Sequence, residues 1–139
     1  MATNEEKKIL VLEEEAGDLG YAVLEYASTA AETELSNKFR WIADHLRQTI
    51  REDTPAKRRP GRREISKRTK ELGDVVRERH NQHHLPFRCL DDYDECVRKR
   101  KREKRSPYLC SIALFICLAN SVKAPLTAMA AAPGQHPPQ

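Results

Sequence analysis

Four cysteines in the second half of the chain are the residues whose type and spacing most constrain its chemistry. They stand at 89, 96, 110 and 117, as two C-x6-C pairs with thirteen residues between them. Seven residues make two helical turns, so the members of a pair would share one helix face, with Cα atoms about 10.5 Å apart. A disulfide needs Cα atoms closer than about 7 Å. A bond inside either pair is therefore excluded if the segments are helical.

The two pairs can be bonded to each other if the chain folds into an antiparallel helical hairpin. Facing residues of such a hairpin have a constant index sum, and the inner and outer cysteine pairs both centre on Glu103. Ser106 and Pro107 follow closely, and serine is a favoured N-cap residue and proline a favoured first helical residue. The predicted turn thus falls where the hairpin needs it. Of the three connectivities that four cysteines allow, the sequence favours two nested disulfides, Cys96–Cys110 inside Cys89–Cys117.

Two other states of these cysteines stay open at this point. Reduced thiols would pack between the helices as small apolar side chains. A zinc ion would also draw on nearby imidazoles, at His80, His83 and His84. Structural zinc sites usually contain a C-x2–4-C pair, which the C-x6-C spacing does not match. We therefore predict no metal site, and no cofactor.

The segment Pro86–Ser121 resembles the cysteine-stapled helical hairpins with twin C-xn-C motifs, such as the coiled-coil-helix–coiled-coil-helix proteins. The paired cysteines of that family are more widely spaced, so the likeness is one of architecture. Proteins of that kind commonly lack a cleavable signal and are oxidised in the mitochondrial intermembrane space. The resemblance implies a structural or assembly role in an oxidising compartment. With reduced cysteines, the expected location is the cytoplasm or the nucleus.

The composition leaves little material for a large core around these cysteines. The chain has 139 residues, of which 39% are hydrophobic and 33% charged, against about 45–50% and 25% in average globular chains. This balance favours one small domain and argues against a large buried active-site cleft. The sequence contains no glycine-rich phosphate loop, G-x-S-x-G or H-E-x-x-H motif. We therefore expect a protein that is not an enzyme and has no small-molecule substrate.

Residues 1–53 have the pattern of acidic amphipathic helices. Apolar residues recur in alternating steps of three and four, as in an a/d seam, at Ile9, Leu12, Ala16, Leu19, Val23, Tyr26 and Ala30. Gly17 and Gly20 interrupt the seam and mark either a break or the close approach of another helix. A second apolar run, Leu35 to Ile50, follows in a different phase, and one bent helix or two antiparallel helices both fit. The seam residues Ile9, Leu12, Leu19, Val23 and Tyr26 either pack in the core or bind a protein partner.

Proline and glycine residues and changes in polarity predict the segment boundaries in the rest of the chain. Residues 54–63 are predicted to be a basic linker, because Pro55, Pro60 and Gly61 interrupt helices. Residues 64–85 are predicted to form a polar helix, and Pro86 to start the cysteine hairpin of 86–122. The alanine- and proline-rich residues 123–139 are predicted to be disordered. The predicted fold class is all-α.

Positive charge is concentrated in two clusters, at 57–63 and 98–105. Residues 1–54 carry a net charge of −6, whereas residues 55–105 carry +9. Each cluster could bind a polyanion by neutralising phosphates, or could consist of solvated side chains alone. The candidate polyanion-binding residues are Lys57, Arg58, Arg59, Arg62, Arg63, Arg98, Lys99, Arg100, Lys101, Arg102, Lys104 and Arg105.

Three functions follow from these patterns. The first is protein interaction, assembly or self-association through the N-terminal seam. The second is nucleic-acid binding by the two basic clusters. The third is a C-terminal membrane anchor at 108–122, although its fifteen residues are short against the roughly 20 of a spanning helix. The polar residues at the start of the sequence are unlike a secretory signal.

Overall fold

The described backbone, residues 3–26 and 30–130 of a computed structural model, is helical and contains no strand. It forms α1 (Asn4–Ala22), the short 3-10 helix η1 (Val23–Tyr26), α2 (Ala30–Ile50), α3 (Pro55–Gln82), α4 (Cys89–Arg102) and α5 (Tyr108–Ala130). The predicted all-α fold class is confirmed. The N-terminal segment contains two α-helices, α1 and α2, rather than one bent helix. Thr3 caps α1 by accepting a hydrogen bond from the Glu6 amide at 3.1 Å.

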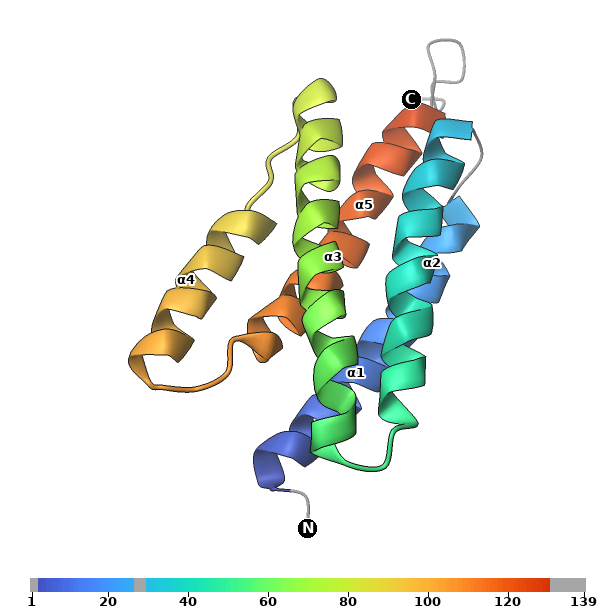
Figure 1. Ribbon diagram of the computed structural model, residues 1–139. Coiled ribbons are helices and arrows are strands. Elements are labelled where there is room, and N and C mark those ends of the chain that lie inside the picture. Colours follow the sequence, from blue (N-terminus) through green and yellow to red (C-terminus); the bar gives the residue numbers. More distant parts are fainter. Residues whose placement is uncertain (1–2, 27–29, 131–139) are drawn as a thin grey trace.

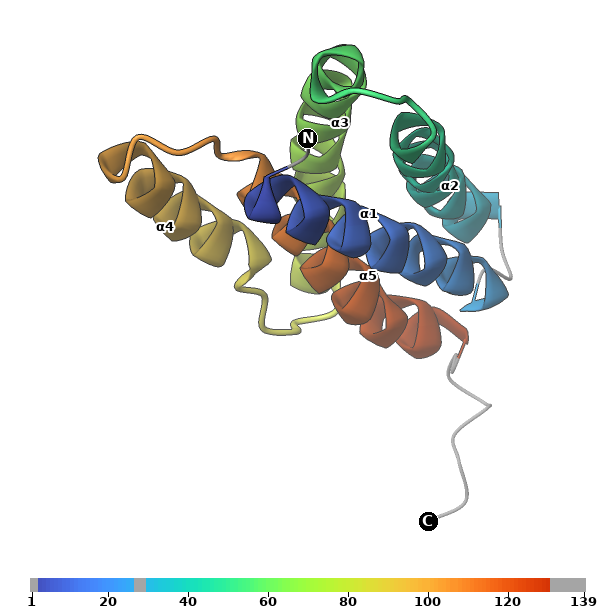
Figure 2. The ribbon, with the colours of Figure 1, turned by 90° about the horizontal axis from the view of Figure 1, so that it is seen from below.

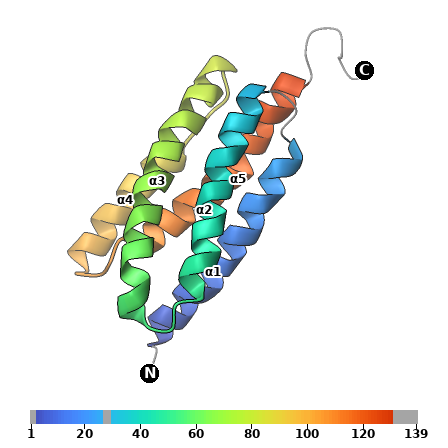
Figure 3. The ribbon, with the colours of Figure 1, turned by 45° about the vertical axis from the view of Figure 1, so that its right-hand side comes forward.

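Four of the helices form a closed bundle. α1 packs on α2, α2 on α3, α3 on α5, and α5 on α1, as Figures 1 and 3 show from two sides. The chain runs up in α1, down in α2 and up in α3 (Figure 1). Short connections therefore make these three helices antiparallel neighbours, which is the usual outcome of short loops in bundles.

α4 lies outside the bundle and brings the chain back to the lower end of the bundle. Its main contact is with α5, and the view from below shows it at the edge of the molecule (Figure 2). Because α4 runs down, α5 can enter the bundle running up, parallel to α3 and α1. One helix of the cysteine hairpin, α5, thus belongs to the bundle, and the other, α4, lies outside it.

The core fills the space between the four bundle helices with large apolar side chains. Phe39 of α2 and Phe115 of α5 are buried and their ring centroids lie 5.5 Å apart. Gly20 of α1 makes room for this pair, since a Cβ there would lie 2.8 Å from Phe115 Cζ. The other fully buried large apolar residues are Leu35, Ile42, Leu46, Ile65, Leu72, Ile112 and Leu118. The apolar run predicted from Leu35 onward therefore faces the core.

The predicted linker at 54–63 is wrong, because α3 begins at Pro55 and continues through Pro60 and Gly61. Thr54 caps the helix through its side chain, and Pro55 occupies a first-turn position where no intrahelical N–H is needed. Pro60 removes one backbone hydrogen bond. The residues on either side of it, Arg58 and Arg62, are held by ion pairs with α1. Tertiary contacts thus outweigh the local cost of the proline.

The nested disulfides are present as predicted. Cys96 bonds Cys110 and Cys89 bonds Cys117, with Cα–Cα distances of 5.7 and 5.8 Å. α4 begins at Cys89 instead of Pro86. α5 extends to Ala130, so its helix covers the first part of the segment predicted to be disordered, while residues 131–139 lie outside the described residues. Within the described residues, no helix is long and apolar enough to cross a membrane.

The turn between α4 and α5 begins with a left-handed residue. Lys104 has φ 56°, its amide donates to the Lys101 carbonyl, and the Arg105 amide donates to the Arg100 carbonyl at 2.9 Å. These two bonds make a Schellman ending, whose left-handed position is usually glycine. A lysine there costs about 1–2 kcal/mol of backbone strain. The chain thus carries a charged residue where local stability favours glycine.

Candidate functional site

Five of the twelve candidate cations are already paired with carboxylates. Lys57 lies 3.1 Å from Asp53, and Arg105 lies 3.9 Å from Glu103, both on the surface. Arg58 and Arg62 pair with Glu6 at 2.9 and 2.7 Å. Arg100 pairs with Glu5. The first basic cluster is therefore divided, with two of its arginines used to join α3 to α1.

A buried polar network links α1, α3 and α5 below this surface. Glu13 is fully buried and accepts hydrogen bonds from Arg62 at 2.9 Å and from the Tyr108 hydroxyl at 2.7 Å. The Arg62 guanidinium also donates to both carboxylate oxygens of Glu6. Each buried charge thus has a partner, which is the condition for tolerating ions in a core.

The network shifts the ionisation of its members. Hydrogen bonds from Arg62, together with the charges of Arg62 and Arg58, hold the pKa of Glu6 below its usual 4.5 although burial opposes this. Burial also opposes the charged form of Arg62, but the hydrogen bonds from it to Glu6 and Glu13 raise its pKa. Burial and the adjacent Glu13 raise the pKa of Tyr108. Glu6 and Arg62 therefore stay charged at neutral pH, and Tyr108 stays a donor.

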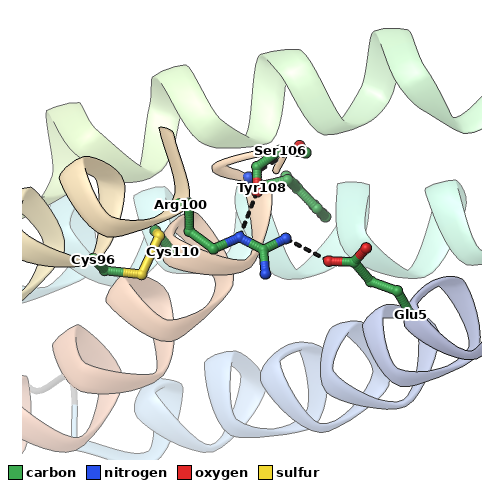
Figure 4. Close-up of a disulfide and its surroundings, with 6 residues drawn as sticks. All are labelled: Glu5, Cys96, Arg100, Ser106, Tyr108 and Cys110. Atoms are coloured by element: carbon green, nitrogen blue, oxygen red, sulfur yellow. Dashed lines mark hydrogen bonds and ion pairs between the residues drawn. A yellow bond between two sulfur atoms is a disulfide. The ribbon is translucent and has the colours of Figure 1, made fainter. Parts of the chain in front are cut away.

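Arg100 fixes the α4–α5 turn against the bundle. Its Nε donates to the Ser106 carbonyl at 2.8 Å, and its Nη2 pairs with Glu5 of α1. Figure 4 shows these contacts beside the Cys96–Cys110 disulfide. The Arg100 charge also lowers the pKa of Glu5, chiefly through the hydrogen bond. The disulfide and this bridge together place the second basic cluster near the start of α1.

A depression of about 560 Å³ lies where α1, α3 and the α4–α5 turn meet. Its walls include Thr3 and Glu5 of α1, Arg59, Arg63 and Ser66 of α3, and Ser106 and Pro107 of the turn, and its lining also includes Glu6, Arg62 and Tyr108 of the buried network. The first basic cluster and the residues next to the second cluster thus line one depression, although they are about 40 residues apart in the sequence. The first turn of α3 and the α4–α5 turn lie at the same, lower end of the molecule in Figures 1 and 3.

Seven cations around this end have no ion-pair partner in the described part of the chain. All seven are exposed, and each lies in α3, α4 or the turn after α4. We refer to them as the unpaired cations: Arg59, Arg63, Arg98, Lys99, Lys101, Arg102 and Lys104. They bring positive charge without an ion-pair partner to one region of the surface.

The N-terminal seam is not an open surface. Ile9 and Val23 belong to the core, and Leu12 and Leu19 are half-buried against it, while the side chain of Tyr26 lies outside the described residues. Four of the five seam residues thus pack in or against the core of this fold, which favours the core alternative, and partner binding through them stays a prediction. Among large apolar side chains in the described residues, only Val11 is strongly exposed, at 56%.

The inward face of α1 is rotated from the predicted seam. Its buried positions are Glu6, Ile9, Glu13, Ala16, Gly17 and Gly20, so carboxylates occupy places where apolar residues were expected. The seven-residue spacing of Glu6 and Glu13 and the four-residue spacing of Arg58 and Arg62 are helical periods. Two acids on one helix face and two arginines on another are a signal from which the buried network could be predicted. Tyr108 had no such signal.

Two other places, a groove and a buried histidine, are weaker candidates for a binding site. A groove of about 290 Å³ between α2 and α3 is lined by half-buried Trp41, but its lining contains as many acids, Glu34 and Glu71, as cations, Lys38 and Arg68. His80 is buried, 4.9 Å from the Phe87 ring, with Nδ1 3.0 Å from the Val76 carbonyl. Neither place has uncompensated charge of one sign.

Comparison of the chain with protein-family models, curated proteins and solved structures gives no match. Function is therefore inferred from the geometry of these residues.

Proposed function

We propose that this protein acts by binding nucleic acid without catalysis, and that the unpaired cations neutralise phosphates of the nucleic-acid backbone. The observation that carries the proposal is the surplus of positive charge around the α4–α5 turn and the start of α3. A polyanion binds there by releasing counterions, which gives affinity independent of sequence. Half or more of protein–DNA hydrogen bonds go to phosphate and sugar, so such contacts suffice for general binding.

Local strain at the turn supports the same assignment. Lys104 keeps a positive charge at a left-handed position that glycine would occupy at lower cost. Four more unpaired cations, Arg98, Lys99, Lys101 and Arg102, crowd the last turns of α4. Like charges at these spacings repel each other. The negative end of the α4 dipole offsets part of that repulsion, and an anionic partner would relieve the rest.

The salt dependence of binding tests this function. A labelled duplex is titrated with the oxidised protein over a range of salt concentrations, and log Kobs is plotted against log salt. With seven unpaired cations the slope should be no steeper than about −6, at about 0.9 per phosphate contact. The variant Lys99→Gln/Lys101→Gln should flatten the slope by about 2.

Arg77→Gln is the matched control. Arg77 is exposed, lies toward the other end of α3 and pairs with Asp74 at 3.1 Å, so its removal should leave the slope unchanged. Absence of binding at about 50 mM salt, or equal slopes for all three proteins, would remove the proposal.

A further inference from the structure

We infer that the depression between α1, α3 and the α4–α5 turn binds a terminal phosphate group of a nucleic-acid strand. This inference rests on the proposed function and names the part of the nucleic acid that the depression takes. The volume of about 560 Å³ falls within the range of small-molecule sites, so it accommodates a phosphate together with its terminal nucleotide.

The charge balance inside the depression favours a dianion. The two acids of its lining are already neutralised, Glu5 by Arg100 and Glu6 by Arg58 and Arg62. Arg62 is largely committed to the buried network, because four of its five N–H groups donate to Glu6 and Glu13. Two uncompensated charges remain, on Arg59 and Arg63. They match the −1.5 to −2 charge of a phosphate monoester near neutral pH, roughly twice that of one backbone phosphate.

The placement of the two arginines fits a single phosphate group. They are four residues apart on α3, so their side chains leave the same helix face. Ser66, three residues further on, and Ser106 of the α4–α5 turn also line the depression and have hydroxyl groups that can donate. Guanidinium groups bind phosphate with paired hydrogen bonds. The depression thus has charged donors on α3 and neutral hydroxyl donors on both α3 and the α4–α5 turn.

The surrounding helix ends add to the same potential. α1, α3 and α5 all begin at this depression, with Thr3, Pro55 and Tyr108 in its lining. The N-terminus of a helix carries a partial positive charge. Three N-termini thus supplement the two arginines. Internal backbone phosphates reach the exposed cations of α4 instead, which lie outside the lining of the depression.

A comparison of two strands that differ only in their end tests the inference. Fluorescence anisotropy measures the binding of one short single-stranded oligonucleotide with a 5′-phosphate and of the same strand with a 5′-hydroxyl. We expect the oxidised full chain to prefer the phosphorylated strand by about tenfold. The variant Arg59→Gln/Arg63→Gln should bind both strands equally.

The variant Lys99→Gln/Lys101→Gln is the matched control, because it removes the same charge outside the depression. It should weaken binding to both strands and keep their ratio. Equal binding of the two strands by the unmodified chain, or a preference that survives Arg59→Gln/Arg63→Gln, would overturn the inference while leaving general nucleic-acid binding intact. Absence of binding to both strands by a chain that binds the duplex would overturn the inference alone, whereas absence of binding to the strands and to the duplex would overturn the proposed function. Tight binding of a phosphoserine peptide without any binding of the strands would assign the depression to a protein partner and refute both.

Discussion

At the scale of single residues, the buried charges make the fold sensitive to loss of their partners. Glu13 is fully buried, and Arg62 and Tyr108 supply its only hydrogen bonds among the described residues. Burying a carboxylate is costly unless it is both paired and hydrogen-bonded. The stability of the bundle therefore depends on a few donors at its lower end.

Removal of these donors should destabilise the fold in a graded way. Arg62→Met leaves Glu6 and Glu13 short of a partner and should lower the free energy of unfolding by about 3–5 kcal/mol. Tyr108→Phe removes one donor to Glu13 and should cost about 1–3 kcal/mol. Urea unfolding of the oxidised protein measures both. Arg77→Met, which breaks an exposed pair, should change stability by at most about 1 kcal/mol, and a similar loss in all three variants would contradict the role of the network.

Glu6 should make the fold sensitive to acid. Its pKa in the folded chain lies below the usual 4.5 because Arg62 and Arg58 favour the carboxylate. The unfolded chain then binds more protons in this range, so stability rises with pH there. The contribution is complete above a pH of about 4.5 and is lost as the pH falls through the lower, folded value.

The measurement is urea unfolding across this acidic range for the unmodified chain and for Glu6→Gln. The variant should be less stable at neutral pH, and its stability should fall less steeply on acidification. Identical slopes for the two proteins would show that Glu6 does not carry the acid sensitivity.

At the scale of elements, two glycines of α1 have opposite roles that the sequence does not separate. A Cβ at Gly20 would lie 2.8 Å from Phe115 Cζ and 3.0 Å from Ala43 Cβ, closer than ordinary contact. A Cβ at Gly17 would lie 3.6 Å from its nearest neighbour, Arg47 Cγ. Gly20 therefore permits the close approach of three helices, whereas Gly17 carries only the helix-propensity cost of glycine.

Alanine at each position should separate these roles. Gly17→Ala should raise the free energy of unfolding by up to about 1 kcal/mol, as expected for glycine in a helix interior. Gly20→Ala should lower it by about 1–3 kcal/mol, because it overpacks the core. Thermal or urea unfolding measures both, and a stabilising Gly20→Ala would mean that α1 is less tightly packed than described.

The disulfides should stabilise α4 more than they stabilise the four-helix bundle. α4 packs mainly on α5, and both disulfides join these two helices. Each bond should add a few kcal/mol by restricting the unfolded chain. After reduction, hydrogen exchange should show the amides of α4 losing protection while those of α2 and α3 keep it.

The control for this experiment is the same exchange measurement on the oxidised protein, in which α4 should be protected. Equal loss of protection in α3 and α4 on reduction would show that the whole fold depends on the bonds.

At the scale of the whole molecule, the acidic and basic halves of the chain meet within one fold. Glu6 and Glu13 pair with Arg58 and Arg62, and Glu5 pairs with Arg100. These pairs leave the unpaired cations as the main uncompensated charge at the lower end. Part of the charge division seen in the sequence is thus compensated by ion pairs between the two halves, and the unpaired cations form the candidate site.

The sequence by itself determined the all-α class, the position of the α4–α5 turn and the pairing of all four cysteines. These depend on helical period, on capping residues such as Ser106 and on arithmetic between Cys89 and Cys117, all of which are local or one-dimensional. Tertiary structure alone decided that Pro60 lies inside a helix, that the seam around Leu12 turns toward the core, and which arginines are consumed by ion pairs. Those outcomes depend on contacts between residues some 50 positions apart, such as Glu6 and Arg58. Local sequence patterns contain no information on such long-range contacts. The sequence therefore could not show which basic residues form ion pairs and which remain available to bind a partner.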